Sequence, residues 1–114
     1  MLHRNWKLRV EDILGAITAI QSYVVGMTYE SFANDHKTVD AVMHNIMILG
    51  EAAGVVPDEV ARRYPEIPWD KMRAIRNIIV HMYFGIRMEI LWQTIQHDLP
   101  PLIPHLKRMY EEAR

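Results

Sequence analysis

One predicted helix, residues 70–83, carries most of the side chains in this chain that could do chemistry. When its residues are placed about 100° apart, the apolar side chains fall on one side, and a polar arc of about 160° falls on the other. Asn77 and His81 are four residues apart, so their side chains can touch. The arc consists of Arg73, Arg76, Asn77, His81 and Tyr83, with Val80 among them.

These residue types suit the cleavage of a phosphodiester bond by phosphoryl transfer. An arginine can hold a phosphate with two parallel hydrogen bonds, and a histidine can accept or donate a proton at neutral pH. A tyrosine adds a hydroxyl group and a stacking ring. In RNA the 2′-hydroxyl can itself be the nucleophile, so neither a metal ion nor a protein nucleophile is required. The spacing also fits a polar helix face with a hydrogen-bonded histidine, and by itself it leaves both interpretations open.

The composition indicates one small domain. The chain has 114 residues, of which 50% are hydrophobic, so a core without covalent links is feasible. It has no cysteine, which excludes a disulfide scaffold, a thiolate zinc site and a cysteine nucleophile, and fits a reducing compartment. No apolar run approaches the ~18 residues that span a bilayer, and residues 1–11 are too charged for a signal peptide. We expect a single domain over residues 1–114, cytoplasmic and away from membranes.

Basic residues are concentrated in one segment. Residues 62–87 carry a net charge of +4, while the rest of the chain carries −5. The overall balance of −1 argues against a general nucleic-acid binder. The basic segment is typical of a solvated helix face and is also the segment that holds the polar arc.

The apolar residues recur with the helical period, and alternating runs are scarce. We therefore predict an all-α fold, an up-and-down bundle of four main helices plus short ones, with a loop over residues 28–35. Asp70 is the predicted N-cap of the helix that carries the polar arc. The predicted helices cover residues 6–26, 37–55, 57–64, 70–83 and 87–98, and a sixth begins at 100 and ends in the charged tail 111–114.

Other constellations are weaker. No two histidines stand four apart and no H-E-x-x-H occurs, so we expect no metal site. Glycine-rich phosphate loops are absent as well, and no cofactor is expected. Glu51 shares a face of the helix 37–55 with His44, and there it could support the site by pairing with an arginine of the helix 70–83. A surface carboxylate is the alternative.

Four ordered blocks resemble a known family. Residues 67–85 read IPWDKMRAIRNIIVHMYFG, which is similar to the HepT-like ribonuclease toxins of the HEPN superfamily and fits their signature R-N-x-x-x-H-x-Y at every fixed position. The block ILGEAA at 48–53 resembles the family's second-helix block. Trp92 with Asp98-Leu99-Pro100 resembles its closing block, and the short element at 57–65 also has a counterpart. The resemblance covers residues 6–108.

The resemblance implies a HEPN-like helical bundle that forms a homodimer, with the motif faces of two subunits meeting in a cleft. It implies a toxin that cleaves RNA without a metal ion, and a MntA-type nucleotidyltransferase antitoxin as its partner. Arg76 and His81 would be the catalytic pair, and Asn77 would assist them. Tyr83 matches the tyrosine to which the antitoxin transfers AMP, and with Arg73 it would contact RNA phosphates. His44 stands where the family often has arginine, so a contact that this arginine makes with RNA in relatives would be weaker or pH-dependent here.

Two other functions fit the same residues. The chain could be a non-catalytic partner that presents a nucleotide to a nucleotidyltransferase, in which case His81→Ala would affect nucleotide binding with no RNase activity to lose. It could also be a scaffold, in which case Arg76→Ala would alter stability alone. No feature of the sequence indicates recognition of a particular RNA base sequence. For a toxin, a transfer RNA is the substrate that we expect.

Overall fold

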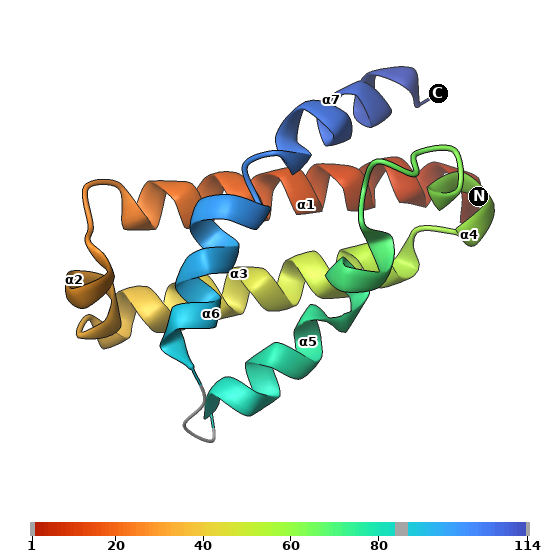
Figure 1. Ribbon diagram of the computed structural model, residues 1–114. Helices are drawn as coiled ribbons and strands as arrows, with labels where there is room; N and C mark the ends of the chain where they lie inside the picture. Colours follow the sequence, from red (N-terminus) through yellow and green to blue (C-terminus); the bar gives the residue numbers. More distant parts are fainter. Residues whose placement is uncertain (1, 84–86, 114) are drawn as a thin grey trace.

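The computed structural model describes residues 2–83 and 87–113, without the side chains of 2–5, 76 and 78–83. Every regular element in these ranges is helical, as predicted (Figure 1). The elements are α1 (Leu2–Val24), α2 (Tyr29–Ala33), α3 (His36–Val55), α4 (Asp58–Ala61), α5 (Trp69–Tyr83), α6 (Met88–Gln93), the π-helical turn η1 (Thr94–Asp98) and α7 (Leu102–Glu112).

The core lies chiefly between α1 and α3, which run antiparallel side by side (Figure 1). Both helices bury residues three or four apart, so each presents one apolar stripe to the other. α5 packs on α3, and α7 packs on α1. The four long helices therefore form the predicted up-and-down bundle. The buried stripes consist of Val10, Ile13, Ile17, Ile20 and Val24 on α1, and Val39, Val42, Met43, Ile46 and Leu49 on α3.

Residues 28–35, predicted as a loop, contain the short helix α2, so that prediction is wrong. Thr28 accepts a hydrogen bond from the Ser31 backbone N–H at 3.1 Å, and the Ser31 hydroxyl accepts one from the Thr28 N–H at 2.9 Å. This reciprocal capping satisfies the first donors of the helix. α2 buries Phe32 completely, and its ring lies 5.1 Å from the Trp92 ring of α6. The hydrophobic contact explains why a five-residue helix is stable here.

The predicted helix 87–98 is divided into α6 and η1. The Leu99 N–H donates to the Thr94 carbonyl five residues earlier at 3.0 Å, and the Thr94 hydroxyl donates to the Ile90 carbonyl at 2.9 Å. The π-helical turn inserts one extra residue per turn and changes which side chains face the bundle. The predicted helix 57–64 is shorter as well and covers only α4. No helix in the described part of the chain is both long and apolar enough to cross a bilayer.

Candidate functional site

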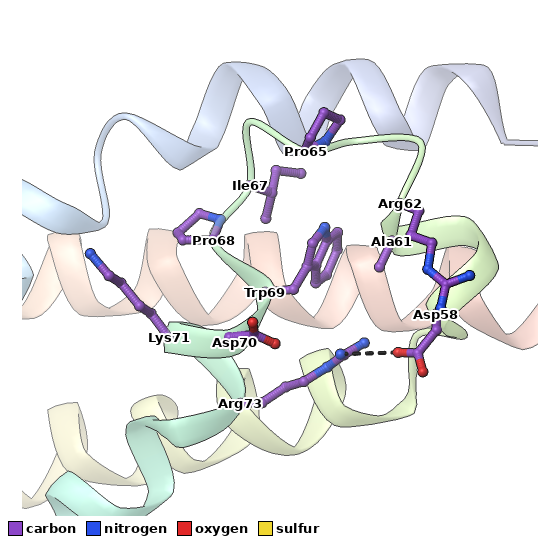
Figure 2. Close-up of a pocket in the computed structure, with 10 residues that line it drawn as sticks. All are labelled: Asp58, Ala61, Arg62, Pro65, Ile67, Pro68, Trp69, Asp70, Lys71 and Arg73. Carbon is purple, nitrogen blue, oxygen red and sulfur yellow. Dashed lines mark hydrogen bonds and ion pairs between the residues drawn. The ribbon is translucent and has the colours of Figure 1, made fainter.

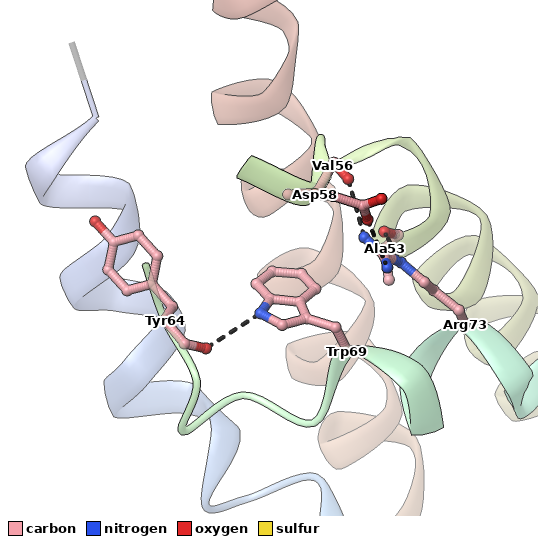
Figure 3. A network of polar contacts seen from close by, with 6 residues as sticks. All are labelled: Ala53, Val56, Asp58, Tyr64, Trp69 and Arg73. Carbon is pink, nitrogen blue, oxygen red and sulfur yellow. Dashed lines mark hydrogen bonds and ion pairs between the residues drawn. The ribbon is translucent and has the colours of Figure 1, made fainter. Parts of the chain in front are cut away.

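The first turn of α5 is held by buried residues of the preceding loop. The Trp69 indole N–H donates to the Tyr64 carbonyl at 3.1 Å (Figure 3). The Ile67 N–H donates to the same carbonyl at 3.1 Å. Both Ile67 and Trp69 are buried. α5 begins at Trp69, so Asp70 lies in the first turn and the prediction that it is the N-cap is wrong. In the first turn its carboxylate still interacts favourably with the positive, N-terminal end of the helix dipole.

Arg73 binds the end of α3 with its whole guanidinium group. Its Nε donates to the Ala53 carbonyl at 3.1 Å, and its Nη2 donates to the Val56 carbonyl at 3.0 Å (Figure 3). Its Nη1 lies 3.2 Å from Asp58 Oδ1, at the start of α4 (Figure 2). The side chain is 27% exposed. Arg73 therefore fastens the motif helix to α3, a role that its place in the polar arc did not indicate.

The need for this contact comes from Pro57. The Ala53 carbonyl would normally accept from the N–H four residues later, but that residue is Pro57, which has none. A proline also disfavours helical backbone in the residue before it, and Val56 is extended with ψ 124°. α3 therefore ends with unsatisfied carbonyls, and Arg73 supplies donors to two of them.

The remaining motif residues follow along α5. Arg76, His81 and Tyr83 have helical backbone, but their side chains lie outside the described residues. Asn77 is exposed. The contacts predicted among the motif side chains therefore stay a prediction, and so does phosphate binding by Arg73.

Glu51 and His44 lie on the exposed face of α3. With Arg9 and Asp12 of α1 they line a groove of about 390 Å³. Arg9 Nε lies 3.1 Å from Asp12 Oδ2. Apolar side chains border the same groove, and Met47 and Val55 are 45% and 54% exposed. This face of the bundle therefore combines both signs of charge with uncovered apolar surface.

A hollow of about 630 Å³ lies at the start of α5 (Figure 2). The cations Arg62, Lys71 and Arg73 line it together with two carboxylates, and Trp69 forms one wall. In the described part of the chain the Arg62 and Lys71 side chains make no hydrogen bond or ion pair. Two cations of the basic segment are thus available to an anion beside the motif helix.

Tyr64 links this region to α7. Burial raises the pKa of Tyr64, and its hydroxyl raises the pKa further by donating to Glu112 Oε1 at 2.6 Å. Arg108 of α7 lies 3.0 Å from Glu66 Oε1 in the same loop. No three His, Asp or Glu side chains within the described ranges are arranged to hold a metal ion.

An all-α bundle with the R-N-x-x-x-H-x-Y motif on one helix is a HEPN-like domain. The family model described as Ribonuclease HepT-like matches residues 13–109. A probable ribonuclease HepT of Thermococcus cleftensis is 37% identical over 113 residues, which cover 99% of each chain. The chain belongs to the HepT-like ribonuclease family.

Other relatives carry related names. A candidate RNase of Methanocaldococcus jannaschii is 32% identical over 101 residues, 89% of this chain and 84% of that one. A candidate RNase of Caldanaerobacter subterraneus is 28% identical over 105 residues, 92% of this chain and 94% of that one. No solved structure matches the chain.

Proposed function

We propose that this protein is a toxin that cleaves RNA endonucleolytically and without a metal ion in the cytoplasm, with a transfer RNA as the expected substrate. The observation that carries the proposal is the complete motif from Arg76 to Tyr83 on α5, inside the stretch that matches the HepT-like family. Arg62 and Lys71, which line the hollow beside α5 and form no ion pair within the described ranges, support an anionic substrate.

The mechanism uses the ribose 2′-hydroxyl as the nucleophile. His81 takes the proton from the 2′-oxygen, which attacks the adjacent phosphorus, and the 5′-oxygen leaves with a proton. Arg76 stabilises the additional negative charge on the phosphorane-like transition state, and Asn77 orients the pair. The products are a 2′,3′-cyclic phosphate and a 5′-hydroxyl. A second His81, from a partner subunit, can supply the proton to the leaving oxygen while the first acts as the base.

A homodimer would bring the two motif helices together. The exposed face of α3 supports this assembly, because Met47, Ile48 and Val55 leave apolar surface uncovered beside Glu51. Arg9, Asp12 and Glu51 provide both signs of charge, so the face can complement a second copy of itself. Glu51 would then support the site from α3.

Neutralisation would come from a MntA-type nucleotidyltransferase antitoxin. The Tyr83 hydroxyl attacks the α-phosphorus of ATP, and pyrophosphate leaves, so that the tyrosine carries AMP. The added nucleotide is bulky and anionic, and it would compete with RNA for the cations beside α5. Tyr83→Phe is therefore expected to keep RNA cleavage but to escape this modification.

The test is cleavage of total RNA in EDTA by protein from a host without the antitoxin, with Tyr83 checked for AMP by mass spectrometry. Wild type is compared with His81→Ala, and with His36→Ala as a control because His36 is an exposed histidine at the start of α3. We expect cleavage by wild type and His36→Ala, with cyclic phosphate ends, and none by His81→Ala. Ends carrying a 5′-phosphate, or a strict magnesium requirement, would refute the mechanism. No cleavage by unmodified wild type would favour the non-catalytic nucleotide-binding partner.

A further inference from the structure

A groove of about 610 Å³ lies between α5, η1 and the start of α7, and the proposed mechanism does not use it. Its floor is apolar and belongs to the core, because the side chains that form it are almost completely buried. A flat aromatic ligand could contact such a floor without losing hydrogen bonds. The floor consists of Leu49, Met72, Ile75, Leu99 and Leu102.

The rim of the groove is polar and exposed. Asn77 of α5 and two residues of η1, His97 and Asp98, line it. In the part of the chain that the structure describes, none of these three side chains has a hydrogen bond or ion pair. His97 and Asp98 lie in the π-helical turn η1, in which the Leu99 N–H donates to the Thr94 carbonyl five residues earlier. The rim thus offers a carboxylate, an amide and an imidazole to a ligand.

The groove adjoins the motif. Asn77 is itself a motif residue, and His81 follows it by one helical turn along the backbone of α5. Lys71 lines both this groove and the hollow that holds Arg62 and Arg73. Figure 2 shows the Lys71 side chain pointing away from Arg73, so the two cavities lie on different sides of the first turn of α5. A strand with its backbone along the cations can therefore place a base in the groove.

We propose that this groove binds one unstacked nucleobase of the RNA substrate and selects bases that carry an amino group. The proposal rests on the ribonuclease function proposed above. The Asp98 carboxylate accepts a hydrogen bond from the exocyclic amino group of adenine, cytosine or guanine. Uracil presents carbonyl oxygens at the corresponding edge and is disfavoured. Single-stranded RNA is read by this combination of apolar contact and edge-directed hydrogen bonds.

The charge of the groove favours a base over a phosphate. The described residues of its lining include two carboxylates, Glu66 and Asp98, and one cation, Lys71; Arg108 pairs with Glu66 at 3.0 Å, so Asp98 is the carboxylate of the two without an ion pair among the described residues. The hollow at the start of α5 has the opposite balance, with three cations and two carboxylates. A phosphate is therefore better stabilised in the hollow, and a neutral base with amino donors in the groove.

The test measures binding without cleavage. Uniform adenine, cytosine and uracil oligonucleotides with 2′-O-methyl groups, which block the nucleophile, are titrated by fluorescence anisotropy. We expect wild type to bind the adenine and cytosine strands about tenfold more tightly than the uracil strand. Asp98→Ala should abolish this preference, and Asp40→Ala, which changes an exposed carboxylate of α3, should keep it. Ala74→Phe fills the groove from an exposed position and should also abolish the preference.

Equal binding of the three strands by wild type would overturn the proposal, as would a preference that survives both Asp98→Ala and Ala74→Phe. Before the titration, circular dichroism is used to check that each variant is folded. Because the strands cannot be cleaved, the result does not depend on catalysis. Active cleavage with no base preference refutes the groove alone. An Asp98-dependent preference in a protein that cleaves no RNA supports the groove and refutes the ribonuclease function.

Discussion

Replacing Arg73 by alanine tests whether this motif-helix residue holds the fold together. The variant loses two hydrogen bonds to backbone carbonyls and one ion pair. A hydrogen bond from a charged donor contributes about 1.5–3 kcal/mol, and the 27% exposure of Arg73 favours the lower end of that range. The ion pair adds about 0–1 kcal/mol, because the Asp58 side chain is 73% exposed.

We therefore expect Arg73→Ala to lower the free energy of unfolding by about 3 kcal/mol. For a chain of this length that loss corresponds to a decrease in Tm of about 12 °C. Arg73→Lys retains the charge but not the planar arrangement of donors, so it should recover about half of the loss. Urea unfolding and thermal melts followed by circular dichroism give both quantities.

Arg62→Ala is the matched control, since Arg62 lines the same hollow and is exposed. It should change the stability by no more than about 0.5 kcal/mol. If Arg73→Ala is no less stable than this control, the structural role assigned to Arg73 is wrong. An RNA affinity that falls at unchanged stability would instead support the sequence-based prediction that Arg73 binds phosphate.

Three further predictions concern the elements that position the motif helix. Trp69→Phe removes the indole donor to the Tyr64 carbonyl, which keeps the Ile67 N–H, and should lower the free energy of unfolding by about 1 kcal/mol in urea titrations; an unchanged midpoint would contradict this. Hydrogen bonds from Thr38, chiefly from its backbone N–H, lower the pKa of Asp35 at the N-cap of α3. Asp35 therefore stabilises the fold above its ordinary pKa, and this contribution is lost as the pH falls through the lower folded value. Asp35→Ala should consequently be less stable than wild type at neutral pH but converge with it in acid, and parallel curves would refute the assignment. Tyr64 has a raised pKa, so its contribution is complete below the ordinary tyrosine value and is lost as the pH rises through the folded value. Tyr64→Phe should remove that alkaline loss, and an unchanged alkaline melting profile would show that the contact with Glu112 does not matter.

The long helices could be predicted because their apolar spacing is local in the sequence. The apolar stripes of α1 and α3 can be recognised in the sequence from apolar residues three or four positions apart, and Pro57 marks the end of α3. α2 was missed because its capping pair is Thr28 with Ser31, and a hydroxyl at the third position is a weaker signal than the usual glutamate. What stabilises α2 is the contact of Phe32 with Trp92, sixty residues later in the chain.

The candidate site also has a part that the sequence predicts and a part that it does not. The motif of Arg76, Asn77 and His81 can be recognised from local spacing, whereas the function of Arg73 depends on a helix end twenty residues away. The one signal for it was Pro57, which removes the donor that the Ala53 carbonyl needs. The groove that His97 and Asp98 line was not predicted, because Asp98 was noted only as part of the closing family block and the π-helical turn changes which side chains share a face.

The contact between the end of α3 and Arg73 has an evolutionary consequence. Pro57 and Arg73 are complementary at the end of α3. Pro57 lacks the backbone N–H that the Ala53 carbonyl would accept from, and Arg73 supplies a donor to that carbonyl and to the Val56 carbonyl. Homologues that lose the proline are released from the requirement for the arginine. The two positions should therefore vary together across the family, and position 73 should change freely only where position 57 can donate.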